Sequence, residues 1–99
     1  MSLTVAISIA PSAPDENGSY AEAVAAAVRV IRESGLANET NAMFTNIEGE
    51  WDEVMAVVKA ATMAVAQLSP RVSLVLKADY REGVTGALSS KVASLEKHL

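Results

Sequence analysis

Residues 3–10 read LTVAISIA, and this stretch has the pattern of a half-buried β-strand. Large aliphatic side chains occupy every second position, and smaller side chains stand between them. Because successive side chains of a strand point to opposite faces of a sheet, the alternation predicts one face on a core and one lined by small residues. We expect the core-facing set to be Leu3, Val5, Ile7 and Ile9, and the opposite set to be Thr4, Ala6, Ser8 and Ala10.

Residues 11–34 predict a loop followed by a helix. The loop, residues 11–18, contains two prolines, an asparagine and a glycine, which resist regular structure. Ser19 and Glu22 have the spacing of a capping box, so we expect a helix from about residue 20 to residue 34. Gly35 supplies a left-handed stop. The apolar stripe of this helix would consist of Tyr20, Val24, Ala27, Val28 and Ile31.

Residues 37–68 predict a hairpin and a second helix. Residues 37–50 are rich in polar side chains, and we interpret them as two strands joined by a tight turn near Met43 and Phe44. Residues 51–68 return to helical spacing, and Pro70 prevents continuation of that helix. Its apolar side would carry Trp51, Val54, Met55, Val58, Thr62, Val65 and Leu68.

The C-terminal third predicts a strand and a last helix. Residues 71–80 alternate again, with Val72, Leu74, Leu76, Ala78 and Tyr80 on one face and Ser73, Val75, Lys77 and Asp79 on the other. Residues 86–97 suit a helix with Thr85 as a cap, and the apolar stripe of this helix would be Leu88, Val92, Leu95 and Leu99.

The resulting order is βαββαβ followed by one more helix. This is the split βαβ arrangement of ferredoxin-like α+β domains, so we expect a ferredoxin-like sandwich with an additional C-terminal helix, built as a single domain over residues 1–99. In that fold the strand order is fourth, first, third, second. Both long helices then cover one face of an antiparallel sheet, and the other face stays free.

Composition narrows the classes of function. The chain has 99 residues, a formal net charge of −4 and a sequence pI near 4.8, which argues against general affinity for nucleic acid. A cationic or neutral ligand is favoured instead. The absence of cysteine excludes disulfides and thiolate metal sites. The apolar stretch near the N-terminus is too short to span a bilayer, so we expect a cytoplasmic protein and no membrane partner.

The free face of the predicted sheet is a candidate ligand site. It would combine the small residues of the first strand with Asn46 and Glu48 on one side and Asp79 on the other, which suits a flat cationic heterocycle. Asn41 and Thr45 could supply paired donors and acceptors, and Phe44 and Trp51 could stack on a ring, although a tryptophan at a helix start is more often a core anchor. The plain alternative is that this face is a dimer interface, and both roles are compatible.

Enzymatic chemistry has little support in the sequence. The single histidine, His98, stands next to the C-terminus, and the glycines form neither a phosphate loop nor a dinucleotide fingerprint. A carboxylate pair such as Glu48 with Asp79 is the remaining route to acid–base catalysis, but nothing in the sequence positions a substrate for it. We therefore expect a protein that is not an enzyme and that has no metal site and no cofactor.

Residues 41–55, NAMFTNIEGEWDEVM, resemble the YkoF-like family of small thiamine-binding proteins. The segments ISIAP, SGL, KADYR and SSKVASLEKHL extend the resemblance over the chain. It implies a non-catalytic protein that binds thiamine or its hydroxymethylpyrimidine moiety as a carrier, buffer or sensor in vitamin uptake or salvage. It also implies a homodimer or homotetramer formed through the sheets.

Carried over by position, this resemblance implies ligand contacts by Ser8, Asn41, Met43, Thr45 and Glu48. Phe44 stands where the family commonly has a smaller residue, which affects the pocket entrance. The chain has one repeat where some members have two, so a complete site could involve a partner subunit. The alternative function is a regulatory oligomeric interaction module with a different small ligand.

Overall fold

The computed structural model describes residues 2–82 and 87–99 of the chain. For residues 87 and 88 it describes the backbone only. The strands are β1 (Ser2–Pro11), β2 (Ala37–Thr40), β3 (Thr45–Gly49) and β4 (Val72–Arg81). The helices are α1 (Ala21–Glu33), α2 (Trp51–Ala66) and α3 (Ala87–Glu96). The predicted cap Thr85 and the side chain of Leu88 lie outside the described residues.

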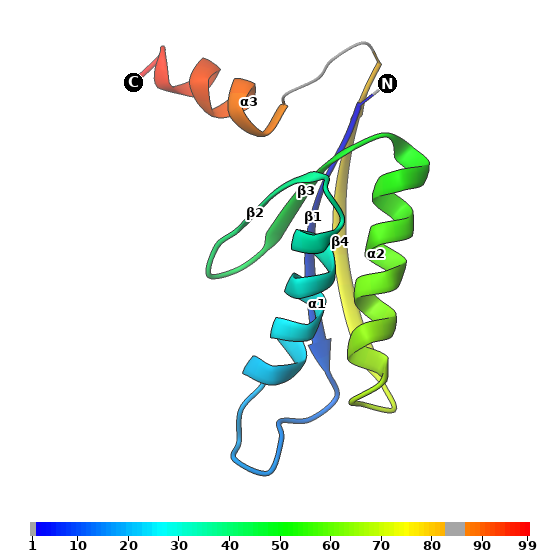
Figure 1. Cartoon of the computed structure of the whole chain (residues 1–99). Coiled ribbons are helices and arrows are strands. Elements are labelled where there is room, and N and C mark those ends of the chain that lie inside the picture. Colours follow the sequence, from blue (N-terminus) through cyan, green and yellow to red (C-terminus); the bar gives the residue numbers. More distant parts are fainter. Residues whose placement is uncertain (1, 83–86) are drawn as a thin grey trace.

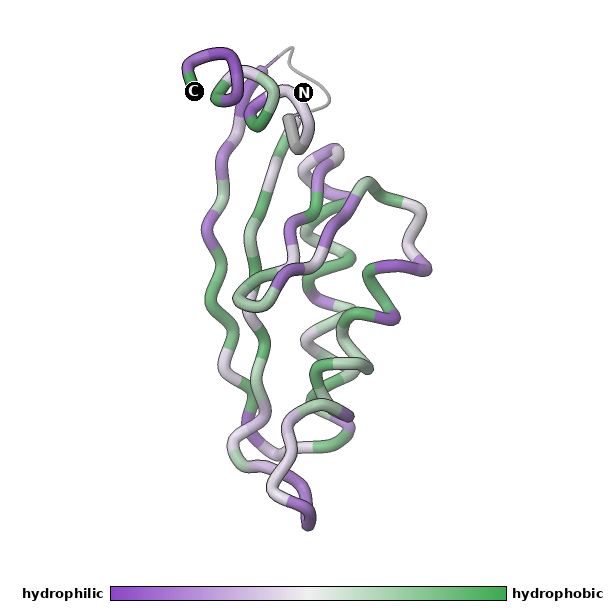
Figure 2. The backbone as a smooth tube through the Cα atoms, turned by 90° about the vertical axis from the view of Figure 1, so that its left-hand side faces the viewer, coloured by the Kyte–Doolittle hydropathy of each residue, from purple (hydrophilic) through white to green (hydrophobic). Residues whose placement is uncertain are grey.

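The four strands form one antiparallel sheet in the order β2-β3-β1-β4. Helices α1 and α2 lie side by side over one face of this sheet, and α3 lies apart from them near one end (Figure 1). This is a ferredoxin-like α+β arrangement with an additional C-terminal helix, as the element order predicts. Figure 2 shows the two long strands on one side of the molecule and α1 and α2 on the other.

The core lies between the sheet and the two long helices. Leu3 and Val5 are fully buried and Ile7 is 2% exposed, while the intervening residues of β1 are only half-buried. The alternation of residues 3–10 therefore assigns both faces of β1 correctly. Ile47 of β3 is also fully buried, which places its neighbours Asn46 and Glu48 on the face without α1 and α2, called here the open face.

Helix α1 begins one residue after its predicted start, and the capping box expected there does not form. It begins at Ala21 with Tyr20 as N-cap, so Ser19 stands one residue too early for a capping box with Glu22. The Ser19 hydroxyl instead accepts a hydrogen bond from the amide of Ala21 at 3.0 Å. Gly35 ends this region with φ +82°, as predicted for a left-handed stop.

The buried stripe of α1 is also different from the predicted one. It consists of Ala23, Ala27 and Ile31, whereas Tyr20 and Val24 are exposed. Tyr20 precedes the first helical turn, and Val24 borders a cavity rather than the core.

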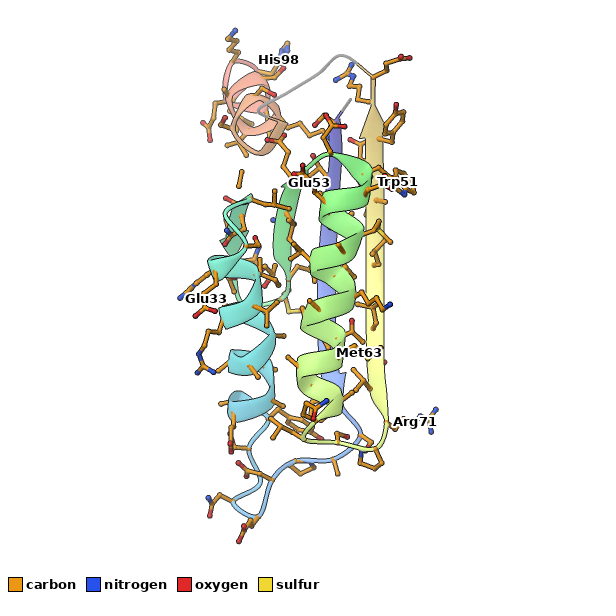
Figure 3. The ribbon with its side chains drawn as sticks, turned by 45° about the vertical axis from the view of Figure 1, so that its right-hand side comes forward. Glu33, Trp51, Glu53, Met63, Arg71 and His98 are labelled. Carbon is orange, nitrogen blue, oxygen red and sulfur yellow. The ribbon has the colours of Figure 1, made fainter. Side chains whose placement is uncertain are left out.

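Helix α2 buries Val54, Val58, Ala61 and Val65 and ends at Ala66, so Leu68 falls outside the helix and is exposed. Trp51, at its first position, is half-exposed and makes an edge-to-face contact with Tyr80 of β4, with ring centroids 6.0 Å apart. Figure 3 shows Trp51 reaching from α2 toward β4, and His98 beyond α3 at the far end of the molecule. No helix within residues 2–82 and 87–99 is long and apolar enough to cross a membrane.

Candidate functional site

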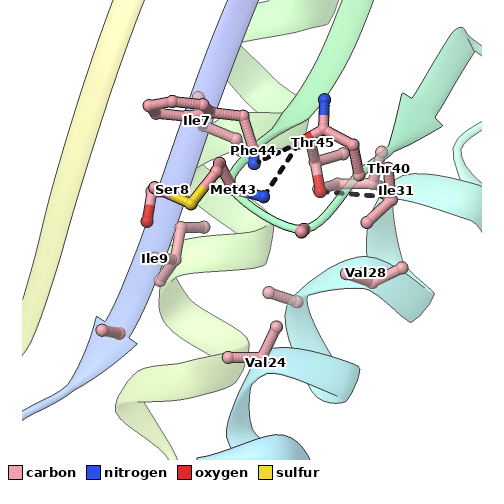
Figure 4. A pocket seen from close by; sticks show the side chains of 14 residues that line it. Ile7, Ser8, Ile9, Val24, Val28, Ile31, Thr40, Met43, Phe44 and Thr45 are labelled. Atoms are coloured by element: carbon pink, nitrogen blue, oxygen red, sulfur yellow. Dashed lines mark hydrogen bonds between the residues drawn. The ribbon is translucent and has the colours of Figure 1, made fainter.

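A cavity of about 210 Å³ lies between the second half of β1, helix α1 and the turn that joins β2 to β3 (Figure 4). Its walls are mostly apolar and come from Ile7 and Ile9 of β1, and from Val24, Ala27, Val28 and Ile31 of α1. The turn adds Ala42, Met43 and Phe44. The polar side chains in the lining are Ser8, Thr40, Asn41 and Thr45.

The cavity exists because β3 is shorter than β1. Pairing between them runs from Leu3 opposite Gly49 to Ile7 opposite Thr45, and β1 then continues to Pro11 without β3 beside it. In a strand, alternate residues direct their N–H and C=O groups toward the neighbouring strand. On the side where β3 turns away, the alternate residues of 8–10 that direct their backbone groups there are paired with no strand of the described residues.

Asn41 fixes the turn that faces this free stretch of β1. Its side-chain oxygen Oδ1 accepts hydrogen bonds from the amides of Met43 and Phe44, each at 2.9 Å. The backbone amide of Asn41 donates to the carbonyl of Phe44, also at 2.9 Å. Since Oδ1 is occupied by two N–H donors, the Nδ2 amino group is the part of Asn41 that can bind a ligand, and it acts only as a donor.

A pair of hydroxyls closes the inner end of the turn. Thr40 Oγ1 and Thr45 Oγ1 lie 3.1 Å apart in a hydrogen bond, and Thr45 is only 6% exposed. Thr45 pairs with the buried Ile7, so its side chain points to the helix side of the sheet and not to the open face. One hydroxyl proton serves this bond, which leaves the pair one donor and several lone pairs for a ligand.

Five of the six predicted site residues line the cavity: Ser8, Asn41, Met43, Phe44 and Thr45. Glu48 does not. It stands opposite Thr4, four residues along β1 from Ser8. The strand register therefore separates the carboxylate from the rest of the predicted set.

The acidic groups expected beside the ligand lie on the open face, on either side of β1 as the strand order predicts, and not in this cavity. Its described lining contains no charged side chain. Thr4 of β1 pairs with Glu48 of β3 on one side and with Asp79 of β4 on the other. Both acids therefore lie on the open face at the end of β1 that is away from the cavity. Lys91 of α3 forms an ion pair with Asp79 there. Helix α3 thus lies near these acids, away from the cavity.

One wall of the site has no signal in the sequence, and one aromatic candidate lies away from the cavity. The spacing of Val24 and Val28 predicts a core stripe, but the same spacing suits the cavity wall that these two side chains form. Trp51, a candidate either for stacking on a ligand ring or for anchoring the core, contacts Tyr80 and does not line the cavity. No group of three or more metal-ligating side chains occurs in the described part of the chain.

The arrangement suits a small, flat and uncharged group. Ligand pockets usually have volumes of roughly 300–1,000 Å³, and this cavity is smaller, about 210 Å³, so it has room for one ring more readily than for a whole two-ring ligand. Apolar walls would cover the faces of that ring, while Asn41 Nδ2, Ser8 and the free backbone groups of β1 could bind its edge.

Comparison with known proteins gives a consistent family. Residues 5–96 match the model of a family described as thiamine-binding protein. A UPF0045 protein of Mycobacterium bovis is 53% identical over 100 residues, which cover 100% of this chain and 96% of that protein. A UPF0045 protein of Synechocystis is 40% identical and covers 82% of this chain and 68% of its own length.

Two crystal structures agree in fold over nearly their whole length. A hypothetical protein of Methanocaldococcus jannascii superposes with a TM-score of 0.85 at 29% identity, covering 97% of each chain. A Thermotoga maritima protein described as a candidate for thiamine biosynthesis or salvage gives a TM-score of 0.80 at 30% identity, covering 96% of this chain and 99% of that one.

Proposed function

The chain belongs to the thiamine-binding protein family, and on that premise we propose that it binds the pyrimidine moiety of thiamine in the cavity beside Asn41. Its role would be that of a non-catalytic carrier, buffer or sensor. The observation that carries the proposal is the uncharged, ring-sized cavity between the end of β1 and a turn in which the Asn41 side-chain oxygen is occupied, so that its Nδ2 amino group can donate to a ligand.

The hydrogen-bonding groups match an aminopyrimidine. Such a ring presents a ring nitrogen, which accepts, next to an amino group, which donates. Asn41 Nδ2 would donate to the ring nitrogen, and a β1 carbonyl or the Ser8 hydroxyl would accept from the amino group. Phe44, half-buried in the lining, would cover one face of the ring.

The charged half of thiamine would lie outside the cavity, over the open face. Among the acidic side chains of the hairpin, Glu39 is the one that the strand register places nearest to the turn. Glu39 pairs with Asn46, directly after the Thr40–Thr45 pair that borders the turn. Asn46 Nδ2 donates a hydrogen bond to Glu39 Oε1 at 3.1 Å, which orients that carboxylate. We assign the attraction of the thiazolium charge to Glu39 rather than to Glu48.

A binding role without turnover follows from the same chemistry. The cavity lining in the described residues holds no carboxylate, histidine or lysine that could move a proton. Acidic side chains outside the cavity, such as Glu39, would attract the positive charge of the ligand and would not exchange protons with the bound ring. Glu48 and Asp79, the pair considered for acid–base work, flank Thr4 at the far end of the face.

The open face also supports assembly of two copies through their sheets. Its central strand carries Thr4, Ala6, Ser8 and Ala10, which are half-buried and small enough for close approach of a second sheet. Val75 on β4 is 56% exposed on the same face. A partner sheet there would cover Val75 and enclose the mouth of the cavity near the exposed Met43.

Calorimetric titration tests the proposal with three ligands: hydroxymethylpyrimidine, thiamine and thiamine diphosphate. We expect heat and a concentration-dependent rise in melting temperature with the first two. The diphosphate should bind no more tightly than thiamine, because the cavity lining offers no cation for a phosphate. Absence of binding by all three compounds would refute the proposal.

A further inference from the structure

Among the polar side chains in the described lining of the cavity, Asn41 alone has a fixed hydrogen-bonding polarity. The others, Ser8, Thr40 and Thr45, are hydroxyls, which rotate and can donate or accept. The side-chain amide of Asn41 has two different ends, an oxygen that accepts and an amino group that donates. The orientation of this amide therefore decides which polarity a ligand meets beside the turn.

Three hydrogen bonds of the turn hold that orientation. The backbone amides of Met43 and Phe44 both donate to Asn41 Oδ1 at 2.9 Å, and Figure 4 draws these bonds as dashed lines. The backbone amide of Asn41 donates to the carbonyl of Phe44, also at 2.9 Å. This third bond closes the turn and so keeps the two donors beside Oδ1.

The reversed orientation of the amide is disfavoured. A half-turn of the side-chain amide would bring Nδ2 to the amides of Met43 and Phe44, so two hydrogen bonds would be replaced by contacts between donors. Each such bond changes an equilibrium constant by roughly two- to tenfold, so the loss of both disfavours the reversed amide by roughly four- to 100-fold. An asparagine without these partners could turn either end to a ligand, whereas Asn41 offers only a donor.

We propose that Asn41 determines which pyrimidines the cavity accepts, by selecting a 4-amino ring over a 4-oxo ring of the same shape. This inference rests on the proposed function. In a 4-aminopyrimidine, the ring nitrogen beside the amino group carries a lone pair, which accepts a hydrogen bond from Nδ2. In the 4-oxo form the same nitrogen carries a hydrogen, so two donors face each other and both lose a partner.

The side chains around Asn41 do not distinguish the two rings. The Ser8 hydroxyl can accept from an amino group or donate to an oxo group, so it tolerates both. Helix α1 contributes apolar walls, among them Val24 and Val28, which contact either ring in the same way because the rings have the same shape. The described lining also has no charged side chain that could stabilise the 4-oxo edge. Discrimination therefore depends on Asn41.

Paired calorimetric titrations test the selection, with hydroxymethylpyrimidine and its 4-oxo analogue at a pH at which both rings are neutral. We expect the unmodified chain to bind the amino compound about five- to 100-fold more tightly, the usual effect of a donor left without a partner. In Asn41→Asp, one carboxylate oxygen still accepts from Met43 and Phe44, and the other replaces Nδ2 with an acceptor. The preference should then disappear or reverse, because this oxygen accepts a charge-assisted hydrogen bond from the 4-oxo ring.

Two further variants make the test specific. Asn17→Asp makes the same change of charge in the exposed loop before α1 and should leave the preference unchanged. Ser8→Ala should weaken binding of both rings to a similar extent, and loss of the preference in that variant would overturn the inference. Equal affinities of the unmodified chain for the two rings would also overturn it, as would an unchanged preference in Asn41→Asp, although the proposed function would stand in both cases. If neither ring binds, the proposed function fails together with this inference.

Discussion

Ser8 and Glu48 lie on the same face of the sheet but belong to different sites. Ser8 lines the cavity, while Glu48 stands opposite Thr4. Four residues of β1 separate the two positions, which at ~3.3 Å per residue places their backbones about 13 Å apart along the strand. A ring held at Ser8 would therefore meet neutral groups, and carboxylates would act on the proposed ligand only from outside the cavity.

Two substitutions of Asn41 separate its structural and ligand-binding roles. Asn41→Asp keeps an oxygen for the amides of Met43 and Phe44 but removes the Nδ2 donor, so the melting temperature should stay nearly unchanged. Affinity for hydroxymethylpyrimidine should fall about fivefold, or about 1 kcal/mol, the typical net value of one hydrogen bond. Asn41→Ala should lower both affinity and stability. Unchanged affinity in Asn41→Asp would contradict the assigned contact.

Filling the cavity should abolish binding without unfolding the protein. Ala10→Leu adds bulk to the lining at a half-buried position, so the ring would lose its space. Ala6→Leu is the matched control, because it lies on the same face of the same strand but outside the lining. Calorimetric titration of both variants should show loss of heat only for Ala10→Leu. Equal loss in both variants would place the ligand on the open face, outside the cavity.

The two carboxylates of the hairpin should differ in their effect on thiamine. Glu39→Gln should weaken thiamine binding about two- to fivefold at low salt, since Glu39 is exposed and its field is screened. Hydroxymethylpyrimidine, which lacks the thiazolium charge, should bind Glu39→Gln as tightly as the unmodified chain. Glu48→Gln should have the smaller effect on thiamine. The reverse order would return Glu48 to the site.

The core position Ile47 should dominate the stability of β3. Its side chain is fully buried between the sheet and the helices, so Ile47→Ala should cost about 2–5 kcal/mol of unfolding free energy in chemical denaturation. Ile47→Val removes a single methyl group and should cost only about 0.5–1.5 kcal/mol. A small loss in Ile47→Ala would mean that β3 is held mainly by its backbone pairing.

Much of the fold could be predicted from local sequence. The alternation in residues 3–10 and 71–80 assigns the faces of both long strands, and Gly35 marks the end of the first helical region. The predicted start of α1 is one residue early, because the spacing of Ser19 and Glu22 is compatible with a capping box that the backbone does not form. Spacing gives a candidate cap, but only the path of the loop decides which residue caps the helix.

The sequence by itself determined the order of the elements, the core face of each long strand and the residues of the turn at Asn41. These features depend on side-chain periodicity and on contacts between residues close in the chain. Only the tertiary structure decided that β3 pairs with half of β1, that valines of α1 form a cavity wall, and that Glu48 faces Thr4 instead of Ser8. Strand register and strand length fix those relations, and both result from packing of the whole sheet against its helices.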